Sequence, residues 1–289
     1  MILLEAVQGR PAKEGAMLKL LRADFSRLFK DKLFYILILG MFAFGAAVPI
    51  IHSMDASYDW SMDSGLFASV CIVPIAASLL TALFVGCEYS DGTLRNKIVV
   101  GHDRVGIYLS NLIVCTTAAL ALCIAYLVPF VCFGATLLMP STVPVLGLTC
   151  LALLGFMVAI AFVAIFTLVS MVCRNRAYTV AICILLAFSL LFMGIMINSA
   201  LNEPEFYSAY SYTVDGVTQE ESASRNPNYL SGTKRKVYEF MYDFTPGGQV
   251  IQIVSMKAKA LYLLALYDVL IIALSMMCGM LLFKRKDLK

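Results

Sequence analysis

Residues 66–86 read LFASVCIVPIAASLLTALFVG, a run without a single charged side chain. A helix needs about 20 apolar residues to cross the hydrocarbon core of a bilayer, and this run has that length. Runs of similar character occupy 33–51, 108–133, 145–172, 178–198 and 259–283. None shows the period-two alternation that marks the strands of a membrane barrel. Because lipid offers the backbone no hydrogen bonds, we expect six transmembrane α-helices.

The composition excludes a soluble globular domain. Hydrophobic residues make up 61% of the chain and charged residues 14%, and the mean hydropathy is +0.84. Soluble domains average about 45–50% apolar and about 25% charged residues. We therefore predict an all-α polytopic membrane protein with six transmembrane helices, an N-terminal interfacial amphipathic helix and an enlarged extracellular region before the last helix.

The distribution of Lys and Arg predicts the orientation, because short cytoplasmic loops are enriched in both. The basic residues of the termini and of the loops expected on the cytoplasmic side are Arg10, Lys13, Lys19, Arg22, Arg27, Lys30, Lys32, Arg95, Lys97, Arg104, Arg174, Arg176, Lys284, Arg285, Lys286 and Lys289. Those within the long segment 199–258 count little, because long loops translocate regardless of charge. The connections 52–65 and 134–144 contain neither Lys nor Arg. The chain then divides into a cytoplasmic segment 1–32, a six-span domain 33–283 and a cytoplasmic tail 284–289. The net charge of +3 reflects this topology, so no nucleic-acid partner is expected.

Residues 15–32 have the pattern of an amphipathic helix lying on the inner leaflet. The apolar side chains that recur at helical spacing are Leu18, Leu21, Phe25, Leu28 and Phe29. A basic flank that only fixes topology is the alternative. Residues 1–16 look unlike the remainder, and Met17 would make a natural start.

The segment 199–258 is too polar to span and is expected outside. It holds Tyr207, Tyr210, Tyr212, Tyr229, Tyr238 and Tyr242, which predict an ordered cap near the lipid headgroups. Its apolar cluster, at Val250, Ile251, Ile253 and Val254, is too short to cross a bilayer. We expect a re-entrant or interfacial helix there; the alternative is a variable surface loop.

Residues 87–104 contain the densest group of polar and charged side chains next to any predicted span. Asp91 or Thr93 can cap a short helix, and Gly101 can end it. Leu94 and Ile98 then form an apolar knob on one face, flanked by Arg95 and Lys97. Such a helix suits docking in a groove of a soluble partner. The alternative is a solvated hairpin loop.

The spacing of Glu88, Gly92-Thr93 and Arg104, leading into Tyr108-Leu109-Ser110-Asn111, resembles the permease subunits of bacterial ABC-2-type transporters. The run Phe244-Thr245-Pro246-Gly247-Gly248-Gln249 resembles the family's segment before its final span. Gly101-His102 stands where the family commonly has a proline before the arginine. The resemblance implies a coupling helix that docks on an ATP-binding subunit through Glu88, Gly92, Thr93, Leu94, Arg95, Ile98 and Arg104.

The resemblance implies a subunit of an ATP-driven exporter in the bacterial plasma membrane, paired with a second permease as a homo- or heterodimer. Candidate substrates are antimicrobial peptides, drugs, lipids or ions. No G-x-x-x-x-G-K-[ST] phosphate loop occurs in the chain, so ATP would be bound by the partner and no cofactor by this chain. The alternative is a non-transporting membrane sensor or scaffold whose outer loop binds a ligand.

One ionisable residue, Asp268, falls inside a predicted span. Such residues are costly in hydrocarbon and normally face a cavity or a partner. It is a candidate for the translocation path, with an interhelical packing role as the alternative. The nine cysteines lie in spans or at their edges without metal-ligand spacing. We expect no metal site, no catalytic residue and no enzymatic activity of the chain's own.

Overall fold

The computed structural model describes residues 17–55, 57–207, 210–214, 217–221 and 223–286. Within them, six helices are long and apolar enough to cross a membrane. They are α2 (Lys32–Met54), α3 (Ser69–Ser90), α5 (Arg104–Leu137), α6 (Val145–Val172), α7 (Arg176–Leu201) and α10 (Leu261–Arg285). The predicted all-α polytopic membrane fold is confirmed. Residues 1–16, with the question of a start at Met17, lie outside the described part.

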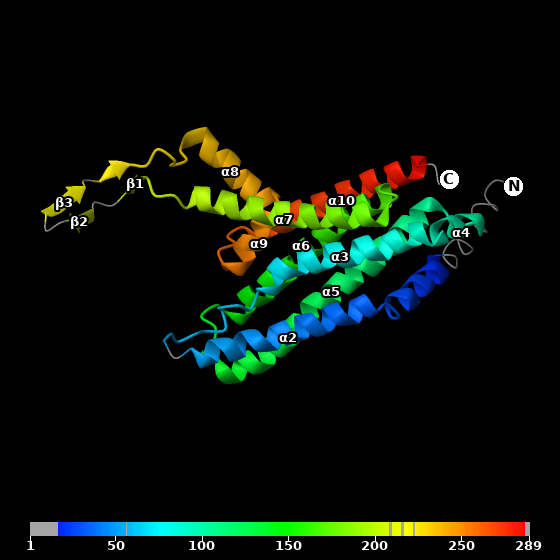
Figure 1. The fold of residues 1–289 in the computed structure, drawn as a ribbon, viewed down its shortest axis with the longest axis horizontal. Helices are drawn as coiled ribbons and strands as arrows, with labels where there is room; N and C mark the ends of the chain where they lie inside the picture. The colour runs from blue at the N-terminus through cyan, green and yellow to red at the C-terminus, as the bar shows by residue number, and fades with distance from the viewer. Residues whose placement is uncertain (1–16, 56, 208–209, 215–216, 222, 287–289) are drawn as a thin grey trace.

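The six helices lie side by side in an elongated bundle (Figure 1). Helix α2 packs on α5, α3 packs on α6 and α7, and α10 packs on α6. The N-terminal helical segment (17–28, dark blue) and the end of α10 lie at one end of the bundle, which we call the termini end (Figure 1). The strands lie beyond the other end, which we call the hairpin end (Figure 1).

Side-chain caps begin the three spans that start at the termini end. Asp31 Oδ1 accepts from the Leu33 N–H at 2.9 Å, where α2 begins. Asp103 caps α5 in the same manner, and Asn175 caps α7. These side chains satisfy N–H groups that have no partner within the helix. The first residue of each of these three spans is therefore fixed locally, by the polar side chain that directly precedes the helix.

Glycines allow close approach of neighbouring helices. A Cβ on Gly194 of α7 would collide with the Gly247 carbonyl oxygen, and one on Gly247 would collide with the Leu190 carbonyl oxygen. Gly247 lies in α9 (Pro246–Val254), a short helix that is largely buried. Small residues are the usual means of bringing backbones together in membranes.

The segment before the last span is ordered into one long β-hairpin, which consists of two short two-stranded sheets, and two helices. Strand β1 (Phe206–Tyr207) pairs with β4 (Ser224–Arg225), and β2 (Tyr210–Val214) pairs with β3 (Val217–Glu221). This hairpin projects past the bundle (Figure 1). Helix α8 (Gly232–Phe244) returns the chain to the bundle.

The predicted helix around Val250 is confirmed, and the surface-loop alternative is wrong for this part. Val250 and Ile253 of α9 are buried, and Gln249 Nε2 donates to the Leu264 carbonyl of α10 at 3.3 Å. The Phe244 ring lies 5.5 Å from the Tyr267 ring, between centroids. The junction of α8 and α9 therefore lies alongside the first two turns of α10.

The N-terminal helical segment over residues 17–28 is rotated relative to the predicted stripe. Leu20, Asp24 and Leu28 are buried, whereas Leu18 and Phe29 of the stripe are exposed. The reason is a set of ionic contacts made by Asp24 and its neighbour Arg27. Asp24 pairs with Lys97 and Arg27 pairs with Glu88, so the side of the helix that carries these two polar residues faces the bundle.

Candidate partner-docking site

The chain turns at Gly92 between α3 and α4 (Thr93–Val99). Gly92 has φ +67°, a left-handed conformation that favours glycine. It is the N-cap of α4 and has no side chain to cap with, so the predicted capping by Asp91 or Thr93 is wrong. Asp91 instead ends α3 through its N–H, and the Thr93 hydroxyl donates to the Glu88 carbonyl at 3.4 Å.

Gly101 ends α4, as predicted. Its φ is +101°, and its N–H donates to the Ile98 carbonyl at 3.0 Å. The His102 N–H donates to the Lys97 carbonyl at 3.0 Å, which completes a glycine-based helix end. Gly101-His102 therefore makes the turn into α5 without a proline.

The predicted Leu94–Ile98 knob does not face outward. Leu94 is 1% exposed, and Ile98 packs partly buried against the core, so this prediction is wrong. The two side chains anchor α4 to the bundle. The apolar side chains that α4 presents are Val99 and Val100, which are 78% and 79% exposed, with Arg95 also exposed.

Lys97 is likewise turned inward, into a polar cluster beneath α4. This Glu88 cluster consists of Glu88, Asp24, Arg27, Lys97, Ser110 and Asn111. Arg27 and Lys97 both donate to Glu88 Oε1, and Asn111 Nδ2 donates to Glu88 Oε2 at 3.1 Å. Glu88 is fully buried. Its two oxygens have three donors from three separate elements.

Asp24 forms the second half of the Glu88 cluster. Lys97 Nζ lies 2.7 Å from Asp24 Oδ1, and the Ser110 hydroxyl donates to Asp24 Oδ2 at 2.6 Å. The guanidinium of Arg27 also stacks over the Phe84 ring, with 3.8 Å between the guanidinium carbon and the ring centroid. Two acids thus face two bases. Buried charges are tolerated when they are paired and hydrogen-bonded in this manner.

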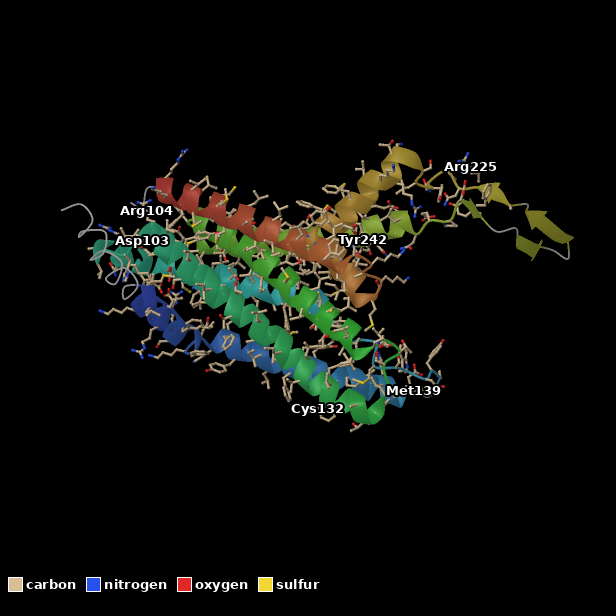
Figure 2. All side chains as sticks on the ribbon, turned by 180° about the vertical axis from the view of Figure 1, so that it is seen from behind. Asp103, Arg104, Cys132, Met139, Arg225 and Tyr242 are labelled. Carbon is tan, nitrogen blue, oxygen red and sulfur yellow. The ribbon has the colours of Figure 1, made fainter. Side chains whose placement is uncertain are left out.

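Arg104 holds the end of the last span. Its Nη1 donates to the carbonyl oxygens of Phe283 and Lys284 at 3.0 Å, and also to that of Lys286. Figure 2 shows Arg104 beside the last turn of α10. The last carbonyls of a helix lack the regular partner four residues on, although that of Phe283 also accepts from the Lys286 N–H at 3.3 Å. A cation at a helix C-terminus is stabilising.

Lys286, which follows α10, links three helix ends at the termini end. Its Nζ donates to the Tyr89 hydroxyl at 2.8 Å and to the Met171 carbonyl at 3.0 Å. Partial burial and, secondarily, the charge of Arg174 lower the pKa of Lys286 to about 8. The ends of α3, α6 and α10 are therefore joined through one side chain.

A groove of about 280 Å³ separates α4 from the N-terminal helical segment. Its lining is Lys19, Leu20, Ala23, Thr93, Asn96, Lys97, Val100 and His102. Val100 lies on its edge, so the exposed valines and the groove form one continuous surface. We call Arg95, Val99, Val100 and this groove the α4 surface.

The sequence located the loop but assigned several side chains to the wrong role. Glu88, Leu94 and Arg104 hold the structure together, whereas Arg95 alone of the predicted side chains is exposed on α4. Sequence reasoning missed Asp24, Arg27, Ser110 and Asn111 of the cluster and Val99 and Val100 of the surface. One usable signal was present: Asp24 and Arg27 are three residues apart on one helix face.

Asp268 lies in α10 and is fully buried. Neither carboxyl oxygen has a hydrogen-bond partner among the described residues. Helix α6, which packs along α10, has no Asp, Glu, Lys, Arg or His over 145–172. Gln249 Oε1, near the preceding turn of α10, is also buried and has no donor in the described part of the chain. Asp268 is thus a polar group in an apolar interface.

The fold defines an all-α polytopic membrane protein, and the contacts above define an anchored short helix at its termini end. No protein-family model matches the chain, and no curated protein matches it. No group of three His, Cys, Asp or Glu side chains in the described residues could hold a metal ion.

Proposed function

We propose that this chain is the transmembrane permease subunit of an ATP-driven ABC exporter, coupled to a separate ATP-binding subunit through residues 87–104. The observation that carries the proposal is the way α4 is held. Buried ion pairs fix its inner side, through Lys97, while Val99 and Val100 stay exposed. A rigid short helix with an exposed apolar pair can pass a partner's motion into the spans.

The contacts of the Glu88 cluster connect α4 to the spans, so a displacement of α4 would be passed to them. Lys97 of α4 bonds both Glu88 of α3 and Asp24 of the N-terminal segment, and Ser110 and Asn111 belong to α5. A push on α4 would therefore act on two spans and the N-terminal segment together. Exposed apolar side chains beside a groove are also typical of an interaction site.

In this proposal the termini end faces the bacterial cytoplasm, where the ATPase subunit binds. This placement agrees with the Lys and Arg distribution. A second permease, identical or related, completes the transporter, and Asp268 is a candidate for the translocation path. The chain contributes no ATPase activity of its own.

Co-purification with the ATP-binding subunit tests the proposal. The variant Val99→Asp/Val100→Asp places two charges on the α4 surface and is expected to abolish both association and coupled ATP hydrolysis. The matched control is Val145→Asp/Leu146→Asp, an apolar pair 76% and 77% exposed at the start of α6. Unchanged association of the α4 variant would refute the docking role.

A non-transporting sensor or scaffold is the second candidate. The observation in its favour is that the β-hairpin projects beyond the bundle, where a ligand could reach it (Figure 1). An adjacent gene for an ATPase favours transport, whereas an adjacent kinase gene favours sensing.

A further inference from the structure

A second cavity lies at the termini end, beside α3 and away from the groove at α4. Its volume is about 320 Å³. It is lined by Arg27, Lys30, Asp31, Leu33, Leu83, Phe84, Cys87, Asp91 and Arg176. These residues come from the N-terminal segment, α2, α3 and α7, so the cavity exists only because the four segments meet.

The cavity has an apolar side and a charged side. Leu33, Leu83 and Phe84 belong to spans, and they supply the side toward the middle of the bilayer. Lys30 and Arg176 lie at the ends of the segments and supply the charged side. An apolar wall joined to cationic groups at the membrane boundary has the polarity of a phospholipid, with its acyl chain beside its phosphate.

The cations of the cavity have unused donors. Lys30 and Arg176 are exposed, and neither side chain forms an ion pair within the described part of the chain. Arg27 donates from Nη1 to Glu88 and from Nη2 to the Phe84 carbonyl, but its buried Nε–H has no partner among the residues that the structure describes. A buried donor without an acceptor costs free energy, and a bound anion would supply that acceptor.

Arg176 is also poorly placed without an anion. It is the first residue of α7, where the positive end of the helix dipole disfavours a cation. Its stem packs on Gly86 of α3, which holds the charge at the cavity. An anion between Lys30 and Arg176 would offset this repulsion.

The two acids limit the charge of the ligand. Asp31 accepts from the Leu33 N–H, and Asp91 accepts from the Ser90 hydroxyl at 3.2 Å. Arg27 is already paired with Glu88, so Asp31 and Asp91 offset the charges of the two remaining cations of the lining, Lys30 and Arg176. A phosphodiester carries a single negative charge, and glycerol hydroxyls could donate to Asp91.

We propose that this cavity binds the headgroup of an anionic phospholipid of the phosphatidylglycerol class, with the phosphodiester between Lys30 and Arg176 and an acyl chain along Leu33 and Leu83. Basic pockets between spans are a known mode of anionic headgroup recognition. The bound lipid would brace the N-terminal segment against α3 and α7.

Native mass spectrometry of the purified full-length chain tests this site. The protein is mixed in detergent with dioleoylphosphatidylglycerol, dioleoylphosphatidylethanolamine or inorganic phosphate. We expect selective retention of the phosphatidylglycerol, and a roughly tenfold loss in Lys30→Gln/Arg176→Gln. Arg176→Lys, which keeps the charge, is expected to retain binding.

Lys257→Gln/Lys259→Gln is the matched control, because it removes two exposed charges just before α10. Equal retention of both lipids, equal binding by the Lys30/Arg176 variant, or an equal loss in the control would each overturn the proposal. Displacement of the lipid by inorganic phosphate would instead identify a soluble anion site and also overturn it.

Discussion

Lys97 Nζ lies 2.7 Å from Asp24 Oδ1, although the two residues are 73 positions apart in the chain. This buried pair joins α4 to the N-terminal helical segment. It makes the short helix part of the bundle's termini end, where an isolated helix of its length would not be stable in water.

Asp24→Asn is expected to lower the free energy of unfolding by about 3 kcal/mol, because it leaves the Glu88 cluster with an uncompensated positive charge. Thermal unfolding in detergent measures the change. Arg22→Gln, on the exposed side of the same helix, should stay within about 0.5 kcal/mol of the wild type. An Asp24→Asn protein as stable as the wild type would show that the pair contributes little.

Gly194→Ala is expected to destabilise the protein by about 1–3 kcal/mol, because the added methyl group meets the Gly247 carbonyl of α9. Gly40→Ala is the control, since a Cβ there meets no atom within 4 Å. That change should be neutral or stabilising by about 1 kcal/mol in a helix interior. Equal unfolding temperatures for the two variants would contradict the close approach of α7 and α9.

Asp268→Leu is expected to raise stability by about 1–3 kcal/mol, because it removes a buried polar group without a partner. Unfolding temperature and substrate export are measured together. Greater stability with lost export would support a place on the translocation path. Greater stability with normal export would assign Asp268 to packing alone, and lower stability would reveal a partner for the carboxyl.

The pH dependence of unfolding tests Lys286. Its folded pKa of about 8 lies below the ordinary value of 10.5, chiefly because of partial burial. Between these values the unfolded chain binds more protons, so this residue makes stability rise with pH over that range. The rise should be absent in Lys286→Met and present in Lys284→Met, whose side chain is exposed. Parallel profiles for Lys286→Met and the wild type would show that Lys286 titrates alike in both states.

Charge reversal at Glu88 or Arg104 is expected to impair folding before it affects any partner. Glu88 is fully buried, and Arg104 is bound to three carbonyl groups at the end of α10. Membrane yield and monodispersity should fall in both variants, while Arg95→Glu on exposed α4 should leave them unchanged. A normal yield of the Glu88→Lys protein would show that the contacts of Glu88 are not needed for folding.

The spans were predictable because apolar length is a property of consecutive residues. The run at 66–86 closely matches α3, Ser69–Ser90, and Gly101 ends α4 by local backbone geometry that the sequence also indicates. The helix near Val250 was recognisable by its apolar cluster. Its burial was not, because the glycine contacts between α7 and α9 join residues more than 50 positions apart.

The sequence by itself determined six membrane-spanning helices and the place of the polar loop at 87–104. Only the tertiary structure decided which side of α4 faces the bundle. Lys97 turns inward because it pairs with Asp24 and Glu88, and Ser110 in turn donates to Asp24. Leu94 on the same helix is buried, and the sequence of α4 alone specifies neither placement. Buried charges require partners, and those partners come from distant parts of the chain. Val99 and Val100 are left outside as a consequence.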